Sequence, residues 1–285
     1  MAPPEDNHNQ RIDAGTYDYI VVGAGSAGCV LANRLTADPG VTVLLLEAGG
    51  SDRHPFISAP AGFFKTINDP RFNWCFQTEP SSHVNDRTIA FPRGKVLGGS
   101  SSINGHLYVR GQPEDYDTWA QAGNRGWSFR DVEPYFQRIE GASNDGEDKA
   151  SGRLVISDIH ERHRLCEAYL EAAAEHQLPV HHNYNGPNQE GVAYLRRTIR
   201  KGRRWSASHA YLRPAIKRPN LHIEKNVLAE KITFDGTRAT GVCYKRGAKV
   251  FWAKAGTECI LSAGAIGSPH LLQVSGVGAP DHLRD

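Results

Sequence analysis

The clearest pattern in the chain is an apolar run, a glycine-rich turn, a helix-like stretch and a second apolar run. Residues 17–22 (YDYIVV) are aromatic and β-branched, as in a buried strand. Residues 23–28 (GAGSAG) follow at once, and from Ser26 apolar positions recur at helical spacing. Residues 41–46 (VTVLLL) form the second apolar run, which ends in Glu47. The pattern predicts a βαβ unit, the context that a dinucleotide-binding fingerprint requires.

The turn has the G-x-G-x-x-G spacing, and each of its glycines has a physical task. Gly23 allows the tight turn, Gly25 lets a pyrophosphate approach the backbone, and Gly28 lets the helix pack closely on the strand. The start of the helix offers free N–H groups and a positive dipole end to the diphosphate. Glu47 is placed to accept hydrogen bonds from ribose hydroxyls. We expect the ADP-ribose of NAD or FAD rather than NADP; the alternative is a glycine turn with no ligand.

A second glycine-rich stretch, residues 94–106 (GKVLGGSSSINGH), has the composition of a ligand cradle. Adjacent glycines remove side chains where a backbone approaches a ligand, and serine hydroxyls with free N–H groups make it polar. A flexible loop is the alternative. Residues 51–93, which precede it, lack periodicity, and such a long irregular segment is typical of a lid or of a cover over a cofactor. In this segment Trp74 either stacks on a ring or anchors the excursion.

The rest of the chain alternates helix-like and strand-like segments around a polar stretch at residues 144–152, which we expect to mark a domain boundary. Helices are predicted over residues 114–122, 129–139, 164–176 and 206–216, the last with Ser206 as N-cap and Pro214 interrupting it. Strands are predicted at residues 154–156, 221–224, 227–233, 240–245, 249–253 and 258–261, with a hairpin around Gly247. After residues 262–265 (SAGA) we expect a helix to open at Ser268 and Pro269, a second turn suited to an anion.

Composition narrows the class of protein. The 285 residues carry a net charge of +2, with 39% hydrophobic and 22% charged residues, which is ordinary for a globular protein of one or two domains. This charge is too small to indicate a nucleic-acid or anionic-membrane partner. The five cysteines are scattered without a CxxC pair, which argues against a disulfide framework and favours a cytoplasmic location. Residues 1–15 are expected to be a disordered tail rather than a signal peptide or membrane anchor, and no apolar run is long enough to span a bilayer.

Two further clusters have simple interpretations. His181 and His182 are adjacent, but no third ligand lies at a helpful spacing, so we expect loop histidines and no metal site. Residues 196–205 are the most basic run of the chain. In a nearly neutral protein this run favours a surface turn, or charge facing a cofactor diphosphate or a neighbouring subunit, over nucleic-acid binding.

Three segments together resemble the glucose-methanol-choline (GMC) oxidoreductases, which bind FAD. The first is the fingerprint at residues 23–28 with Glu47. The second begins at residue 94 and continues to Asp117, and it is similar to the first signature of the family. The third, residues 264–278 (GAIGSPHLLQVSGVG), is similar to the second signature. The likeness covers nearly the whole chain after the tail, and residues 72–74 (FNW) resemble the choline-dehydrogenase-like branch.

The resemblance implies a set of FAD-binding residues. Ser26, Ala27, Glu47 and Ala48 would hold the diphosphate and ribose, Val96, Ser100 and residues 104–107 would line the flavin, and the backbone of Val227 would meet the adenine. The complete predicted set is Gly23, Gly25, Ser26, Ala27, Gly28, Glu47, Ala48, Trp74, Val96, Gly99, Ser100, Asn104, Gly105, His106, Leu107 and Val227. Without the family Val227 would be an ordinary strand residue, and His106 either faces the substrate or only packs.

The chain also departs from the family pattern. Some members carry a His bonded covalently to the flavin where this chain has Ile103, so we expect non-covalent FAD. Family chains are much longer, with a catalytic His near their C-terminus that no histidine here matches. The catalytic residue is therefore unassigned and expected in a missing C-terminal half. The expected fold is α/β: a Rossmann-like FAD-binding domain at residues 16–152 and 201–285, and a discontinuous, partly missing α+β substrate domain at residues 153–200.

The activity that the resemblance implies is oxidation of a primary or secondary alcohol by hydride transfer to flavin N5. The expected partners are a small-molecule alcohol and an oxygen or quinone-type electron acceptor, with the choice between oxidase and dehydrogenase open. The sequence does not indicate an oligomeric state. Two alternatives remain: an FAD-containing enzyme of the hydroxynitrile-lyase type, and an inactive truncated FAD-binding fragment.

Overall fold

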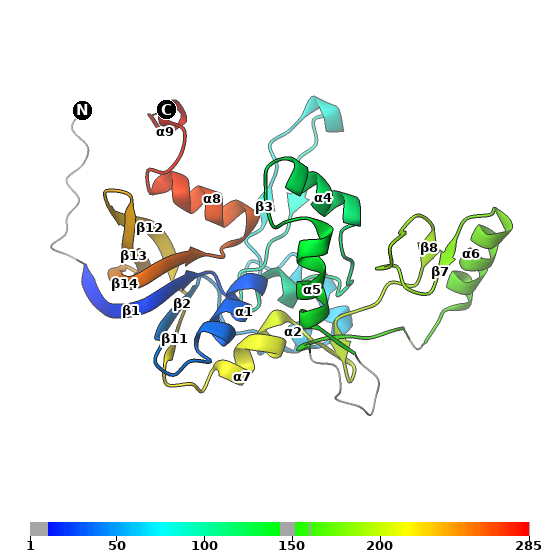
Figure 1. Cartoon of the computed structure of the whole chain (residues 1–285), viewed down its shortest axis with the longest axis horizontal. Helices are drawn as coiled ribbons and strands as arrows, with labels where there is room; N and C mark the ends of the chain where they lie inside the picture. Colours follow the sequence, from blue (N-terminus) through cyan, green and yellow to red (C-terminus); the bar gives the residue numbers. More distant parts are fainter. Residues whose placement is uncertain (1–10, 143–151, 160, 285) are drawn as a thin grey trace. The chain divides into compact units, whose positions relative to one another are not determined.

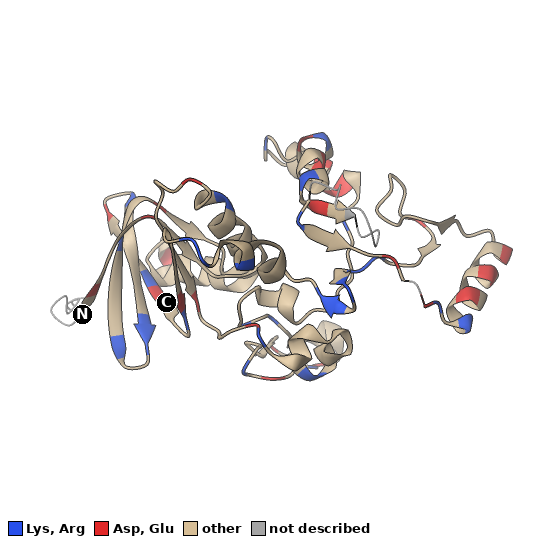
Figure 2. Ribbon diagram, turned by 90° about the horizontal axis from the view of Figure 1, so that it is seen from below, with Lys and Arg blue, Asp and Glu red and all other residues tan. Residues whose placement is uncertain are grey.

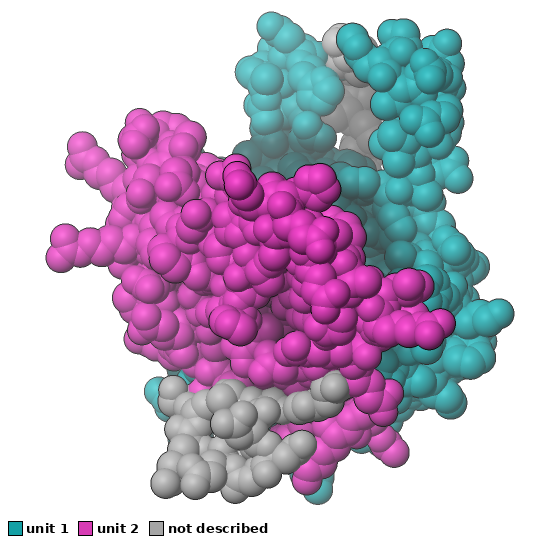
Figure 3. Space-filling model, turned by 90° about the vertical axis from the view of Figure 1, so that its right-hand side faces the viewer, with its two compact units in different colours: residues 1–104, 206–285 teal, residues 105–205 magenta. Residues whose placement is uncertain are grey.

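The computed structural model describes residues 11–142, 152–159 and 161–284. The chain divides into two compact units, which Figure 3 shows in different colours. Unit 1 is formed by residues 1–104 together with 206–285, and unit 2 by residues 105–205. Unit 1 contains the fingerprint turn and most of the predicted cofactor-binding residues.

A six-stranded sheet is the centre of unit 1 (Figure 1). Its strand order is β11-β2-β1-β14-β13-β12, and the first four strands are parallel while β13 and β12 run antiparallel to their neighbours. The bounds are β1 (Ile12–Val22), β2 (Val43–Glu47), β11 (Leu221–Lys225), β12 (Leu228–Asp235), β13 (Arg238–Arg246) and β14 (Lys249–Leu261). The parallel strands place the carboxyl ends of β1, β2 and β14 at one edge of the sheet, where α/β proteins bind nucleotides.

Helices and short segments connect these strands. The α-helices of unit 1 are α1 (Ser26–Leu35), α2 (Pro55–Ser58), α3 (Phe63–Thr66), α7 (Arg213–Ala215), α8 (Gly264–Val274) and α9 (Pro280–Arg284). The 3-10 helices are η2 (Pro60–Gly62), η3 (Ser82–Val84) and η4 (Gly99–Ser102), and η5 (Ser208–Leu212) is a π-helix. Strands β3 (Phe76–Gln77) and β4 (Ala90–Phe91) pair with each other. The long segment before residue 94 is therefore built from short ordered elements.

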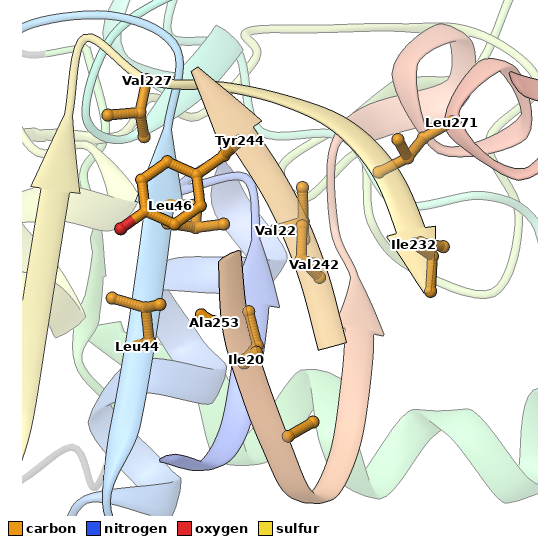
Figure 4. Close-up of a cluster of buried hydrophobic side chains, with 11 residues drawn as sticks. Ile20, Val22, Leu44, Leu46, Val227, Ile232, Val242, Tyr244, Ala253 and Leu271 are labelled. Carbon is orange, nitrogen blue, oxygen red and sulfur yellow. The ribbon is translucent and has the colours of Figure 1, made fainter. Parts of the chain in front are cut away.

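The main buried cluster lies on one face of the sheet (Figure 4). Alternate residues of a strand share a face, so Ile20 of β1 joins Leu44 of β2 in this cluster, together with Val242 and Leu271. Residues such as Leu45, on the opposite face, are equally buried. Burial on both faces explains why the apolar runs at β1 and β2 are continuous rather than alternating.

The described residues of unit 2 form three α-helices and pairs of short strands. The helices are α4 (Pro113–Gln121), α5 (Phe129–Ile139) and α6 (Arg164–Glu175), and α6 carries acidic side chains along its length (Figure 2). The paired strands are β5 (Glu140–Ala142) with β6 (Leu154–Ile156), β7 (Val180–His181) with β8 (Val192–Ala193), and β9 (Ile199–Arg200) with β10 (Arg203–Arg204). Glu140 accepts hydrogen bonds from Tyr108 and Arg110, which ties the start of the unit to the end of α5.

Several sequence predictions are corrected by the structure. Residues 12–15, expected in the tail, belong to β1 because their backbone pairs with β14 whatever their side chains; residues 1–10 lie outside the described residues. Residues 249–253 and 258–261, expected as two strands, form one strand, β14. Helix α8 begins at Gly264 rather than at Ser268, and Pro269 lies inside it. The helix expected over residues 206–216 is a π-helix followed by α7.

The predicted domain boundary is not described by the structure. Residues 144–151 lie outside the described residues. The chain passes from one compact unit to the other between residues 104 and 105 and between residues 205 and 206. The assignment of cofactor and substrate roles to separate domains stays a prediction. Among the described helices none is long and apolar enough to cross a membrane. The described part of the chain likewise contains no group of three His, Cys, Asp or Glu side chains that could hold a metal ion.

Candidate cofactor-binding site

The fingerprint turn follows β1 directly and is packed so tightly that glycine is required. The N–H group of Gly23 donates to the Leu46 carbonyl at 2.8 Å, and its φ of +97° favours glycine. A Cβ on Gly23 would lie 2.6 Å from the Ser262 carbonyl oxygen, and a Cβ on Gly28 would overlap the carbonyl oxygen of Gly23. Gly25 differs, because the nearest atom to a Cβ there is 3.8 Å away. Protein atoms therefore crowd two of these glycines, whereas a Cβ on Gly25 would make only an ordinary van der Waals contact.

Helix α1 begins immediately after Gly25 and is not capped by a side chain. The N–H of Cys29 makes the first intrahelical bond, 3.0 Å to the Gly25 carbonyl, and the preceding residues Ser26 and Ala27 are exposed. The first amides of a helix have no intrahelical acceptor, and they lie at the positive end of its dipole. An exposed, uncapped helix start beside a glycine with free space fits a diphosphate.

Glu47, the last residue of β2, lies next to this turn and is buried. Its Oε2 accepts a hydrogen bond of 2.8 Å from the Ala24 N–H, and its Oε1 accepts one of 2.9 Å from the Gly49 N–H. Burial raises the pKa of Glu47 to about 7, although the two amides and the charge of Lys95 act in the opposite direction. Each oxygen keeps a further lone pair after these two hydrogen bonds. The role of Glu47 in binding ribose hydroxyls stays a prediction.

Val227 lies beside Glu47, while its contact with the adenine stays a prediction. Its N–H donates to the Glu47 backbone carbonyl at 3.1 Å, and the N–H of Asn226 donates to the Gly49 carbonyl at 3.0 Å. Val227 is buried, whereas Ala48 is half-buried between these contacts. Backbone hydrogen bonds therefore connect the residues just before β12 with the end of β2 and the turn that follows it.

The glycine- and serine-rich stretch lies directly on the fingerprint turn. The Gly98 N–H donates to the Ala24 carbonyl at 2.8 Å, and a Cβ on Gly99 would lie only 2.7 Å from the Cα of Gly25. Ser100 accepts a hydrogen bond of 3.0 Å from the Gly94 N–H through its hydroxyl oxygen, while Val96 is buried and pairs with Gly50 in an isolated bridge. The structure thus brings the first two family segments into contact.

This stretch is ordered, in contrast to the flexible-loop alternative. Residues 99–102 form the 3-10 helix η4, and the Ser102 hydroxyl donates to the Leu97 carbonyl at 2.7 Å. The Ser101 hydroxyl donates to the Gly98 carbonyl at 2.6 Å and accepts from the Ala207 N–H at 3.0 Å. Ile103 is 2% exposed and packs in a cluster with Ile57, Phe72 and Val96. Its side chain is therefore occupied in the core.

The remaining predicted residues have different surroundings. Trp74 is half-buried and stacks on Phe76 with 5.7 Å between ring centroids. Its backbone N–H donates to the Arg93 carbonyl at 2.9 Å. Trp74 therefore contacts the irregular segment, residues 51–93, that it was proposed to anchor. Asn104 is exposed at the end of its segment of unit 1.

Gly105, His106 and Leu107 belong to unit 2. Gly105 and Leu107 are exposed, whereas the His106 side chain is buried at a positive φ of 68°. Burial, followed by the charges of Arg204 and Arg197, lowers the pKa of His106 to about 4. His106 is therefore neutral at neutral pH.

Sequence reasoning missed two residues at this edge of the sheet. The Ser262 hydroxyl lies within hydrogen-bonding distance of the Val22 carbonyl, at 3.0 Å, and of the Gly23 carbonyl, at 2.8 Å, so it ties the end of β14 to the fingerprint turn. The small residues after β14 were the signal that could have identified it. Lys95 was read only as part of the glycine-rich stretch, yet its charge acts on Glu47. No local signal in the sequence indicates this electrostatic effect.

Comparison with known proteins places the chain in a family. Residues 17–283 match the GMC oxidoreductase family, and the chain belongs to it. It is 45% identical over 271 residues to the oxygen-dependent choline dehydrogenase of Sinorhizobium fredii, and the aligned region covers 94% of this chain and 49% of that protein. It is 43% identical over 276 residues to an alcohol dehydrogenase [acceptor] of Pseudomonas putida, and the aligned region covers 94% of this chain and 50% of that protein.

The chain shares its fold with solved structures of oxidases. The crystal structure of pyridoxine 4-oxidase from Mesorbium loti superimposes with a TM-score of 0.88 at 33% identity, covering 94% of this chain and 53% of that one. The expected α/β fold, with the FAD-binding architecture of the GMC family, is confirmed. The chain spans about half the length of the curated relatives that it matches.

Proposed function

We propose that this chain binds FAD non-covalently and forms the cofactor-binding part of an oxidoreductase that acts on alcohols. The observation that carries the proposal is the meeting of three chain segments at the carboxyl edge of β1, β2 and β14. There an uncapped helix start, a buried carboxylate and two glycine-rich turns lie in direct contact. FAD, when bound, supplies the acceptor for a hydride.

The residues present fit this cofactor. The uncrowded backbone at Gly25 and the first amides of α1 would take the diphosphate, and Glu47 would accept hydrogen bonds from the ribose hydroxyls. The ordered stretch around Ser100 would hold the flavin. Ile103 packs among apolar side chains, so no histidine is available there for a covalent bond to the flavin. The backbone of Val227, which is bonded to Glu47, would face the adenine.

The reaction that this site would serve is oxidation of a primary or secondary alcohol, with oxygen or a quinone as the acceptor. The relatives named choline dehydrogenase and alcohol dehydrogenase support an alcohol substrate. We assign no residue of this sequence as the base that takes the hydroxyl proton. The cytoplasmic location expected from the cysteines stays a prediction.

A pair of glycine variants tests FAD binding. Gly25→Ala adds a methyl group at a φ of −73°, and the nearest protein atom to it, the Ser262 carbonyl oxygen, lies at an ordinary van der Waals distance of 3.8 Å. The substitution should therefore leave the thermal unfolding temperature within a few degrees of wild type. FAD affinity should fall at least tenfold, because the methyl group occupies the space proposed for the diphosphate. Gly28→Ala is the matched control: its Cβ overlaps the Gly23 carbonyl, so it should lower the unfolding temperature of the apoprotein itself.

FAD binding is measured by quenching of flavin fluorescence, and folding by circular dichroism. Equal FAD affinity in Gly25→Ala and wild type would place the diphosphate elsewhere. Anaerobic mixing of the holoprotein with a panel of alcohols then tests the reaction. Loss of the oxidised-flavin absorbance supports alcohol oxidation, whereas no bleaching with any alcohol would favour a lyase-type activity or an inactive fragment.

A further inference from the structure

The π-helix η5 is joined to α1, the helix that begins at the fingerprint turn. π-Helices are rare, and they occur mostly as single turns, frequently at functional sites. The side-chain amide of Asn33 in α1 donates a hydrogen bond of 2.7 Å to the Tyr211 carbonyl of η5, and both residues are buried. Helix α7, which continues directly from η5, also lies beside α1 (Figure 1). The helix proposed to take the diphosphate is therefore fixed against η5.

The start of η5 is bonded to the glycine- and serine-rich stretch. The Ala207 N–H donates to the Ser101 hydroxyl oxygen at 3.0 Å, and this hydroxyl donates in turn to the Gly98 carbonyl at 2.6 Å. A Cβ on Gly98 would lie 3.2 Å from the Ser208 Cβ and 3.4 Å from the Ser206 hydroxyl oxygen. Both of these serines are buried. The stretch proposed to hold the flavin therefore packs on the first residues of η5.

An ion pair holds the other end of η5 to the loop between β2 and α2. Asp52 lies in this loop and is buried, and its Oδ2 accepts a hydrogen bond of 3.0 Å from Nη2 of Arg213, the residue that follows η5. Nδ1 of His209, inside η5, lies 3.8 Å from the same Asp52 oxygen and 3.1 Å from the Ser206 hydroxyl oxygen. The loop that begins at Glu47 is therefore fixed to η5 by charged and polar side chains.

We propose that Asp52 and Arg213 are positioning residues of the cofactor site. Through η5 they hold the loop after β2 in register with the glycine- and serine-rich stretch, so that one FAD molecule reaches both at once. The proposal rests on the proposed FAD function. Neither side chain is required to touch the cofactor, because the Asp52 carboxylate and the Arg213 guanidinium are bonded to each other.

The joined structure of FAD gives this role a distinct signature. FAD consists of an ADP part linked to a riboflavin part, so its second part binds with the advantage of a tethered ligand only when both places are correctly spaced. Loss of the Asp52–Arg213 pair removes a restraint on this spacing while leaving the residues of each place intact. FAD affinity should therefore fall by about tenfold, whereas ADP alone and riboflavin alone should bind within about twofold of wild type.

The test compares the affinities of FAD, ADP and riboflavin in Asp52→Asn, Arg213→Met and the double variant. Fluorescence quenching measures the two flavins, calorimetry measures ADP, and circular dichroism checks folding. The double variant should lose no more FAD affinity than the single variants, since all three remove the same pair. Arg284→Met is the matched control: Arg284 pairs with Asp281 at 3.4 Å in α9, and its loss should leave all three affinities unchanged.

Each other outcome refutes a defined part of the argument. Equal losses for ADP and FAD would mean that the pair acts only within the adenosine side, and unchanged FAD affinity would refute its role altogether. Arg213→Met decides the question if Asp52→Asn does not fold, because the Arg213 side chain is 34% exposed and that of Asp52 only 4%. Failure of the folded wild-type protein to bind FAD would overturn the proposed function and this inference together.

Discussion

Glu47 should make the stability of the apoprotein fall as the pH rises through neutrality. Burial raises its pKa from 4.5 to about 7 in the folded protein. The folded state therefore binds this proton more tightly than the unfolded chain does. The stabilisation from the proton is fully present below pH 4.5 and is lost as the pH rises through about 7. Above pH 7 the protein carries a buried carboxylate at a net cost.

The magnitude follows from the same shift. Each unit of pKa difference is worth about 1.4 kcal/mol, so the whole shift is worth about 3 kcal/mol. About 2.5 kcal/mol of this is lost between pH 5 and pH 8. Glu47→Gln removes the titration. It also adds a pH-independent cost of about 1–3 kcal/mol, since the amide NH2 must face the N–H of Ala24 or Gly49, both of which are donors.

Urea unfolding of the apoprotein at several pH values separates these two effects. The difference in unfolding free energy between Glu47→Gln and wild type should move in favour of the variant by about 2.5 kcal/mol from pH 5 to pH 8. Glu79→Gln, at an exposed position, is the control and should show no such trend. A difference that stays constant over this range would show that Glu47 titrates normally, and it would refute the argument from burial.

Two other predictions concern residues near the glycine-rich stretch. Ile103→Ala should lower the free energy of unfolding by about 2–5 kcal/mol, because it removes a side chain that is 2% exposed. Ile266→Ala, at an exposed site, is the control and should change the free energy of unfolding little. Denaturant titration measures both variants. His106 should titrate in NMR spectra with a midpoint near pH 4, since burial and then the charge of Arg204 lower its pKa from 6.5 to about 4. The free energy of unfolding should accordingly fall as the pH drops from about 6.5 to about 4. A midpoint near 6.5 would contradict the burial of this imidazole.

The sequence predicted the part of the fold that depends on periodicity and local turns. The βαβ unit around α1 was correctly located because buried parallel strands leave continuous apolar runs, and a glycine turn joins strand to helix. Helices α4, α5 and α6 were also located within a residue or two. Their amphipathic spacing and caps, such as Ser128 with Asp131 at the start of α5, are local signals.

The errors occur where tertiary pairing overrides local signals. Strand β14 contains Gly256 and polar neighbours that indicate an interruption, and the register against β1 does shift here, between the Tyr17–Ala255 and Tyr19–Glu258 pairs. The strand continues because its pairing with β1 resumes at Glu258. The strand β1 extends to Ile12 for the same reason. The small residues after β14 indicated a turn at Ser262, but not its hydrogen-bonding distance to the Val22 and Gly23 carbonyls, which lie far away in the chain.

Glycines in the candidate site serve two physical tasks that their spacing in the sequence does not distinguish. At Gly28 and Gly49 a Cβ would overlap backbone atoms of Gly23 and Lys95, so these glycines are needed for the apoprotein to fold. At Gly25 a Cβ would make only an ordinary van der Waals contact of 3.8 Å with the Ser262 carbonyl oxygen, so folding alone does not require glycine there. A glycine that packing does not require, placed at an uncapped helix start, is explained by a ligand that must come close to the backbone. Substitutions at Gly25 and Gly28 should therefore separate binding from folding, and this separation is the physical content of the proposed site.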